Sequence, residues 1–235
     1  MKKYELTTET KINILGKKLF RIKALVSFGS IIAGEKGGWI EKEENLSQSG
    51  NSWVYDNAEI SGNVKVSGDA KVSGNACVYD NADISGKAWV YDNADISGNV
   101  KVSGYAKVSG NACAYGNACV YGNAWIHGNA RIYGNACVSG NACVSGNAVV
   151  SGNARIFDNA NVSGNADYTT IHGFGTCFRT TTFFRCKDKK IKVSCGCFFG
   201  TISEFRDQVK RTRKGKVAEE YLMIADLMEK HFTEE

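Results

Sequence analysis

A six-residue repeat fills the middle of the chain. Between residues 51 and 170 the sequence runs as 20 consecutive hexapeptides of the form Asn-Ala-x-Val-Ser-Gly, without an insertion. Slots two and four are apolar, whereas slot three varies among charged, aromatic and small residues. This alternation predicts a short strand with one buried face, and the Gly-Asn or Asp-Asn pair at slots six and one predicts a corner. So strict a period predicts one structural unit stacked on itself.

The pattern resembles the hexapeptide-repeat left-handed β-helix, in which three hexapeptides close one triangular coil. That resemblance implies a mainly β fold, a left-handed parallel β-helix or triangular solenoid, with six to seven coils in the repeat. A longer duplication agrees with it. The segment that starts at Trp53 recurs nearly unchanged from Trp89, 36 residues later. This distance equals two whole coils, so every duplicated side chain stays on its original face.

The repeat divides the chain into three predicted parts. We expect an N-terminal β cap over residues 1–50, the β-helix over residues 51–170, and a small C-terminal α+β domain over residues 171–235. Caps are needed because each end of a stacked solenoid exposes strand edges and an uncovered core.

The C-terminal part carries its own local signals. Residues 177–186 and 190–195 predict a hairpin, and Thr201 and Glu204 form a capping box that begins a helix. A second helix is expected after Gly215. We therefore predict a hairpin plus two helices, used for oligomerisation or partner binding.

Sorting slot three by face gathers three tryptophans and two lysines on one wall of the prism. Aromatic residues or a histidine follow these tryptophans at the adjoining corner. The predicted binding residues are Trp53, Lys71, Trp89, Lys107, Trp125, Tyr55, Tyr91 and His127. A subunit or domain interface is the favoured interpretation, because exposed apolar patches mark contact surfaces. The alternatives are a stacking platform for bases or nucleotides, and a self-contained ladder of cation–π pairs.

The second predicted helix is apolar on more than one side. Its spacing points one apolar face at the hairpin: Val217, Ala218, Tyr221, Leu222, Ala225, Met228 and Phe232. Further apolar residues lie off that face, which favours contact with another subunit. The predicted interface residues are Tyr221, Leu222, Met223, Ile224, Leu227 and Met228. We accordingly expect a homo-oligomer, a dimer or a trimer.

The 9 cysteines do not predict a metal centre. Those in the repeat, at 77, 113, 119, 137 and 143, follow its period and are interpreted as small strand formers. The C-terminal set resembles zinc ligands in type, but its spacing matches no compact knuckle. That set is Cys177, Cys186, Cys195 and Cys197, with His172. Burial as small apolar residues is the favoured interpretation, and no metal or other cofactor is predicted.

Charge and hydropathy limit the classes of partner. The net charge of +5 comes from basic end segments, while the repeat is slightly acidic, so nucleic acid is a less favoured partner. No apolar run is long enough for a membrane span, and the N-terminus lacks the apolar core of a secretion signal. We expect a protein of the cytosol that binds no membrane.

The segments beside the repeat resemble those of uncharacterised phage and prophage proteins. The matching stretches are residues 19–25, 37–41 and 193–205. This resemblance implies a phage-encoded, non-enzymatic binding protein in the host cytosol. It would act against host defence by docking on a protein effector or by sequestering a small nucleotide.

Acyl transfer is the alternative function. Many left-handed β-helix proteins are acyltransferases that use a histidine as general base and bind coenzyme between subunits. Here no loop interrupts the repeat to build a substrate pocket. His127, the one histidine of the repeat, stands in a slot otherwise filled by Ser, Tyr, Phe or Thr. We therefore predict no catalytic residue.

Overall fold

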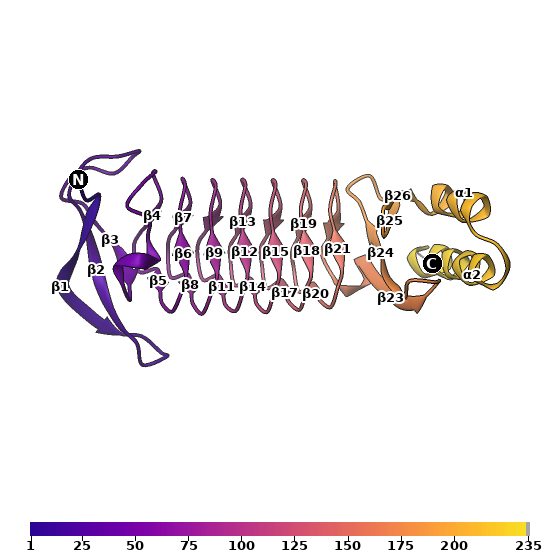
Figure 1. The fold of residues 1–235 in the computed structure, drawn as a ribbon, viewed down its shortest axis with the longest axis horizontal. Coiled ribbons are helices and arrows are strands. Elements are labelled where there is room, and N and C mark those ends of the chain that lie inside the picture. Colours follow the sequence, from indigo (N-terminus) through magenta and orange to yellow (C-terminus); the bar gives the residue numbers. More distant parts are fainter. Residues whose placement is uncertain (234–235) are drawn as a thin grey trace.

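The computed structural model describes residues 1–233 as an elongated molecule (Figure 1). Short strands are stacked along its long axis, a small sheet covers the N-terminal end, and two helices lie at the other end. The longest purely parallel sheet has seven strands, one per layer. The predicted mainly β solenoid with a small C-terminal α+β region is therefore confirmed.

Three walls enclose the solenoid, each a stack of two-residue strands. The first wall comprises β4 (Trp53–Val54), β7 (Lys71–Val72), β10 (Trp89–Val90), β13 (Lys107–Val108), β16 (Trp125–Ile126), β19 (Cys143–Val144) and β22 (Asn161–Val162). The second comprises β5 (Glu59–Ile60), β8 (Cys77–Val78), β11 (Asp95–Ile96), β14 (Cys113–Ala114), β17 (Arg131–Ile132) and β20 (Val149–Val150). The third comprises β6 (Lys65–Val66), β9 (Asp83–Ile84), β12 (Lys101–Val102), β15 (Cys119–Val120), β18 (Cys137–Val138) and β21 (Arg155–Ile156).

The slots of the repeat explain how one coil stacks on the next. Slots two and four supply a continuous core of Ala, Val and Ile that is almost completely buried. Backbone bonds join successive coils, as where the N–H of Lys107 donates to the Ala124 carbonyl at 2.8 Å. The side-chain amides of slot one also join successive coils, at the corners, which explains why this slot is Asn. Asn111 Nδ2, for example, donates to Asn129 Oδ1 of the next coil at 3.1 Å. Similar amide ladders are known from other stacked parallel strands.

An antiparallel hairpin and one further strand form the N-terminal cap. β1 (Tyr4–Ile12) and β2 (Lys18–Ala24) pair with each other, and β3 (Lys36–Ile40) joins β2 to the solenoid. β3 is parallel to β5, with Trp39 opposite Glu59, so it extends the second wall. A short 3₁₀ helix, η1 (Glu43–Asn45), follows. Stacking thus begins in front of residue 51, where the repeat pattern starts.

The opposite end is covered by an antiparallel sheet. Its strands are β23 (Tyr168–Phe174), β24 (Arg179–Arg185), β25 (Ile191–Cys195) and β26 (Phe198–Thr201). β24 and β25 form the predicted hairpin, whereas the sequence pattern does not predict β23 or β26. β24 crosses the open end, where Phe184 joins the solenoid core and the backbone N–H of Arg155 donates to Thr182 Oγ1 at 3.1 Å.

The last hexapeptide does not form a coil. Residues 165–170 contain the 3₁₀ helix η2 (Asn165–Asp167) and the start of β23. Tyr168 stands in slot four, where the other coils place Val, Ile or Ala, and its ring is too large for the interior. It packs half-buried against the end of the core and donates its hydroxyl hydrogen to the Val149 carbonyl. The solenoid therefore ends at β22.

Two helices complete the C-terminal region, α1 (Ile202–Thr212) and α2 (Gly215–Phe232). The capping box is confirmed: Thr201 Oγ1 accepts from the N–H of Glu204 at 3.2 Å, and Glu204 Oε2 accepts from the N–H of Thr201 at 2.7 Å. Both helices pack on the sheet around Phe183 and Phe205. Within the described residues, neither helix combines the length and apolar content that crossing a bilayer requires.

The N-terminal cap buries one lysine. Lys3 is 4% exposed; its Nζ donates to the Ser52 carbonyl at 2.9 Å and lies 4.9 Å from the centre of the Phe28 ring. Burial lowers the pKa of Lys3 to about 8, because removal from water disfavours the charged form. The cap therefore holds a destabilised positive charge at neutral pH.

We expect the protein to gain stability relative to a Lys3→Met variant as the pH rises from 7 to 9. Above pH 8 the folded chain loses this proton, while the unfolded chain, whose lysine titrates near 10.5, retains it. The free energy of unfolding then rises with pH, by about 1 kcal/mol at pH 9. Urea unfolding at both pH values measures the difference, and Lys65→Met on the exposed third wall is the control. An identical pH response in the wild type and Lys3→Met would contradict the prediction.

Candidate functional site

Strand pairing places the predicted stripe on one wall. The outward residues of the first wall pair in the order Trp53, Lys71, Trp89, Lys107 and Trp125. The sorting of slot three by face is therefore confirmed. Adjacent strands are about 4.8 Å apart, so the indoles of Trp89 and Trp125 are separated by about 10 Å along the wall.

Each exposed tryptophan packs against a ring at the adjoining corner. The ring centres of Trp89 and Tyr91 are 4.6 Å apart, with 37° between the ring planes. Trp125 and His127 repeat this arrangement at 4.4 Å and 38°. The two tryptophans are 40% and 43% exposed. The wall thus presents two aromatic pairs, each open to solvent on one side.

Hydrogen bonds fix the direction of both indoles. The Nε1–H of Trp89 donates to Ser73 Oγ at 3.0 Å, and that of Trp125 donates to Ser109 Oγ at 3.2 Å. Each serine lies one coil before its tryptophan, at the same corner as the stacked ring. Along this edge of the solenoid, the corner residue is alternately an aromatic ring or histidine and a serine. The surroundings of Trp89 and Trp125 are therefore nearly identical. The rings are consequently held in place before any partner binds.

The lysines of the wall are exposed and unpaired. Within residues 1–233, the side-chain ammonium group of neither Lys71 nor Lys107 makes an ion pair, a hydrogen bond or a contact with an aromatic ring. The interpretation of the stripe as a ladder of cation–π pairs therefore has no support in these contacts. Both ammonium groups remain available to an external negative charge.

Trp53 corrects one part of the predicted stripe. Its ring is 0% exposed, covered by Phe28 and Tyr4, whose ring centres lie 5.4 Å and 6.0 Å away. Tyr55, at the same level, is half-buried against the solenoid core. The repeat pattern could not reveal this, because the covering rings come from the N-terminal cap. We define the aromatic stripe by the exposed side chains Lys71, Trp89, Lys107 and Trp125, together with the half-buried rings Tyr91 and His127 that stack on the two tryptophans.

The predicted interface on α2 is also corrected. Tyr221, Ile224 and Met228 are at most 8% exposed and belong to the C-terminal core, and Leu222 is half-buried against it. The three buried residues are therefore not available to a partner, and Leu222 presents only part of its side chain. Met223 and Leu227 are exposed, as expected. Helical spacing alone assigned Ile224 to the wrong side, because both the sheet and α1 cover this helix.

The C-terminal cysteines form no cluster with His172. Among the described residues, no three His, Cys, Asp or Glu side chains are placed to hold a metal ion. Cys186 is buried beside the end of the solenoid, and burial raises the pKa of its thiol to about 11. The expected burial is wrong for Cys177 and Cys197, which are exposed.

His127 contacts a cysteine of the next coil. Its Nε2 lies 3.4 Å from Cys143 Sγ. Burial raises the pKa of the Cys143 thiol, so this group stays protonated at neutral pH and is a poor nucleophile. Together with the stacking on Trp125, this contact is typical of a structural histidine.

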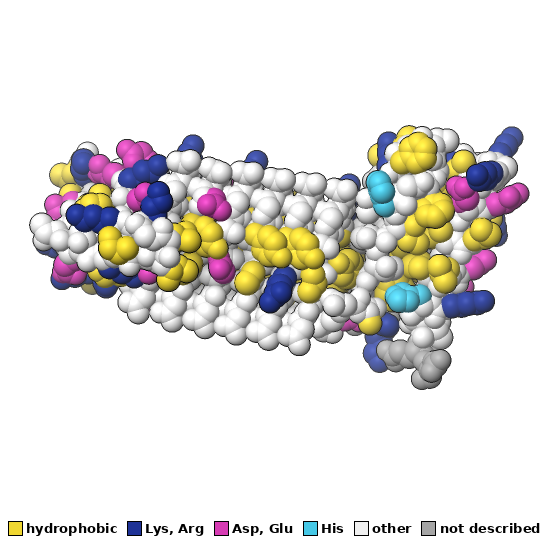
Figure 2. Space-filling view, turned by 90° about the horizontal axis from the view of Figure 1, so that it is seen from below, with side chains coloured by type: hydrophobic (Ala, Val, Ile, Leu, Met, Phe, Trp, Pro, Cys, Tyr) yellow, Lys and Arg dark blue, Asp and Glu magenta, His cyan; other side chains and the backbone are white. Residues whose placement is uncertain are grey.

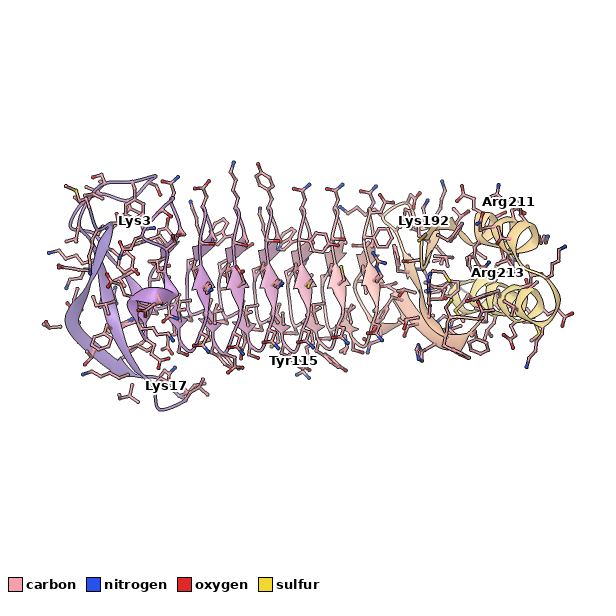
Figure 3. The ribbon with its side chains drawn as sticks, viewed as in Figure 1. Lys3, Lys17, Tyr115, Lys192, Arg211 and Arg213 are labelled. Carbon is pink, nitrogen blue, oxygen red and sulfur yellow. The ribbon has the colours of Figure 1, made fainter. Side chains whose placement is uncertain are left out.

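A third aromatic pair at the solenoid surface, away from the first wall, was not predicted. Tyr115 and Tyr133 stack with 4.9 Å between ring centres and 6° between planes, at the corner beside the second wall. Figure 3 labels Tyr115 at the lower edge of the solenoid, and Figure 2 shows a band of apolar side chains on that side. The signal in the sequence is a tyrosine in slot five at a spacing of one coil.

Comparison with known proteins agrees with the solenoid. A family model described as the YdcK beta solenoid repeat matches residues 130–145, which contain β17 to β19. The chain is also similar to a protein of Escherichia coli (strain K12) named uncharacterized acetyltransferase YdcK. The two are 41% identical over 71 residues, which is 26% of this chain and 21% of the relative. The middle of the chain is a β-solenoid. The match covers about a fifth of the relative's length.

Proposed function

We propose that this protein is a non-enzymatic binding protein that docks a partner protein on the aromatic stripe. The observation that carries the proposal is the pair of exposed indoles, Trp89 and Trp125, each held by a stacked ring and a serine hydroxyl. Tryptophan is enriched among the residues that dominate binding energy at interfaces, and preordered side chains lose little entropy on binding.

The charges of the stripe favour a partner with an acidic surface. Lys71 and Lys107 alternate with the tryptophans, and the outward strand positions of the first wall carry no carboxylate. An acidic partner would pair with both ammonium groups while its apolar side chains cover the indoles. Rim lysines of this kind accelerate association and select partners by charge.

Further parts of the proposal rest on resemblance. The two end segments resemble segments that flank such repeats in phage and prophage proteins, and from this we infer that the protein acts in the cytosol of an infected host. The docked partner is then a host defence component. A dimer or trimer of this chain, joined through the exposed Met223 and Leu227 of α2, would present two or three copies of the stripe.

A double variant tests the docking surface. Immobilised wild-type protein is expected to retain a host protein whose recovery falls at least tenfold with Trp89→Ala/Trp125→Ala. Tyr115→Ala/Tyr133→Ala is the matched control, because it removes one exposed and one half-buried ring from another edge of the same solenoid. Quantitative mass spectrometry of the bound fraction measures recovery, and circular dichroism checks folding. The proposal would be overturned if both double variants reduced the recovery of the bound protein equally. It would also be overturned if the tryptophan variant retained every protein as well as the wild type does.

Acyl transfer is the second candidate, favoured by the name of the Escherichia coli relative, an uncharacterized acetyltransferase. In this case His127 would act as general base on the first wall. Turnover of acetyl-coenzyme A that disappears in His127→Ala would support it. The replacement of His127 by Tyr, the residue at the equivalent corner of the Trp89 coil, is expected to preserve the packing. Absence of turnover in the wild type leaves binding as the function.

A further inference from the structure

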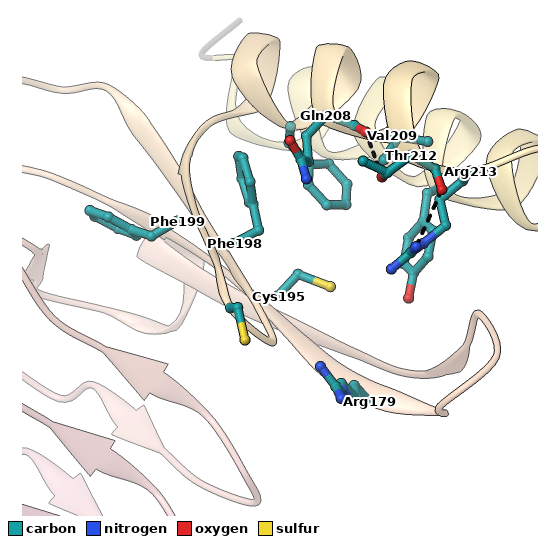
Figure 4. Close-up of a pocket in the computed structure, with 11 residues that line it drawn as sticks. Arg179, Cys195, Phe198, Phe199, Gln208, Val209, Thr212 and Arg213 are labelled. Carbon is teal, nitrogen blue, oxygen red and sulfur yellow. Dashed lines mark hydrogen bonds between the residues drawn. The ribbon is translucent and has the colours of Figure 1, made fainter.

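A cavity in the C-terminal region carries a distinct set of side chains. It lies between α1 and the strands β25 and β26 and has a volume of about 460 Å³ (Figure 4). This volume falls within the range of small-molecule sites. Its lining residues are Arg179, Cys195, Cys197, Phe198, Phe199, Phe205, Gln208, Val209, Thr212, Arg213 and Tyr221.

Two guanidinium groups give the cavity its charge. Arg179 extends from the start of β24, and Arg213 follows the C-terminal end of α1, so they approach the cavity from different elements (Figure 4). Arg213 Nη1 donates to the Thr212 carbonyl at 3.3 Å. Within residues 1–233 neither arginine pairs with a carboxylate, and the lining contains no Asp or Glu. Most of their N–H donors therefore remain free for an anion.

The turn between β25 and β26 allows Arg179 to reach this position. Gly196 has a φ of +62°, and a Cβ at this residue would collide with Arg179 Nη1. The guanidinium thus lies directly against the backbone of the turn. The backbone conformation favours a glycine at this position, and the missing side chain leaves the space that the arginine occupies.

The rest of the cavity is apolar and aromatic. Phe205 and Val209 are each 3% exposed and form a rigid floor, with Phe198 beside them. The Tyr221 hydroxyl donates to the Phe174 carbonyl at 3.3 Å, and burial raises the pKa of Tyr221 to about 12, so the group stays neutral. A flat apolar body could therefore enter without burying a negative charge of the protein.

We propose that this cavity binds a phosphate ester with an aromatic body, of the size of a nucleoside monophosphate. Arg179 and Arg213 would bind the phosphate, since guanidinium groups pair with phosphate oxygens in a bidentate manner. The base would contact Phe198 and Phe205. This site is separate from the aromatic stripe and does not depend on the docking function proposed above.

A neighbouring hollow extends the basic surface. It shares Arg179 with the cavity, has a volume of about 580 Å³, and is also lined by Arg155 and His172. Its lining likewise contains no carboxylate. We expect a second phosphate on the same ligand to lie toward this side, so a nucleoside diphosphate should bind more tightly than a monophosphate.

Calorimetric titration of the full chain tests the site. The probes are the four common nucleoside monophosphates, adenosine diphosphate, adenosine and inorganic phosphate. At least one nucleotide is expected to bind saturably with one site per chain. Adenosine and inorganic phosphate, which each lack one half of the ligand, should bind at least tenfold more weakly than this nucleotide. Arg179→Gln and Arg213→Gln should each weaken nucleotide binding tenfold or more. Arg211→Gln is the control, because Arg211 lies on α1 but does not line the cavity. This variant should leave nucleotide binding unchanged.

Three results would overturn the proposal. The first is that no nucleotide binds saturably at 1 mM, and the second is that Arg179→Gln and Arg211→Gln lose nucleotide affinity equally. The third is that a single-stranded oligonucleotide binds tightly while mononucleotides do not bind. The last would assign the arginines to a nucleic-acid surface, whose affinity falls steeply with salt. A melting curve of each variant confirms that it is folded, so that loss of binding can be assigned to the lost guanidinium.

Discussion

Replacing Trp53 by alanine is expected to lower the free energy of unfolding by about 3–5 kcal/mol, the range for deleting a buried aromatic ring. The indole is fully buried and joins the cap to the first wall through Phe28 and Tyr4. Its removal opens a cavity that the β-sheet around it cannot close. Urea unfolding followed by circular dichroism measures the loss.

Trp89→Ala is the matched control for Trp53→Ala, because both residues begin nearly the same sequence on the same wall. Trp89 is 40% exposed, so its removal should cost less than about 1 kcal/mol. Trp53→Phe should cost less than Trp53→Ala, since Trp53 Nε1 has no hydrogen-bond partner among the described residues and phenylalanine removes that buried donor. Equal losses for Trp53→Ala and Trp89→Ala would contradict the burial of Trp53.

Gly128→Ala is expected to destabilise the solenoid by about 3 kcal/mol, through backbone strain and a clash between coils. Gly128 has a φ of +71°, which L residues rarely adopt. A Cβ at this position would also lie 3.0 Å from the backbone nitrogen of Gly146 in the next coil. Gly146 lies at the corner of that coil, and its carbonyl accepts from the N–H of Asn129 at 2.8 Å, so moving this backbone away would strain a bond between coils.

Gly152→Ala separates these two contributions. Its φ of +66° is similar, but a Cβ there meets nothing within 4 Å, so only backbone strain of about 1 kcal/mol is expected. Gly128→Asp should recover part of the loss, since natural aspartates occupy this slot. Asp92, for example, accepts from the N–H of Gly110 in the next coil at 3.1 Å. Melting temperatures of the three variants test the order, and equal effects at both glycines would exclude a clash between coils.

The repeat made the interior of the solenoid predictable, because each slot meets the same surroundings in every coil. An apolar residue in slot four must point inward, and slot three must then point outward. The chain length of one coil fixes which outward residues become neighbours. Lys107 could therefore be placed between Trp89 and Trp125 from the sequence, and the strand register agrees.

The geometry of the candidate site was less accessible to sequence reasoning. Trp53 and Trp89 stand in nearly identical segments, yet only Trp89 is exposed, because Phe28 and Tyr4 cover the first coil from another part of the chain. The serine bonds of the indoles join residues 16 positions apart and depend on the tilt of each ring. Neither property follows from the period.

The stacked walls, their facing side chains and the capping box of α1 follow from local patterns, because short-range geometry and burial alone specify them. The cavity near Arg179 and Arg213 does not, since its charge comes from two arginines on different elements that only the folded chain brings together. The same holds for Ile224, which spacing placed outside the core and which the sheet and α1 bury. Contacts between non-repeating segments have no period to reveal them, so they become visible only once the chain is folded.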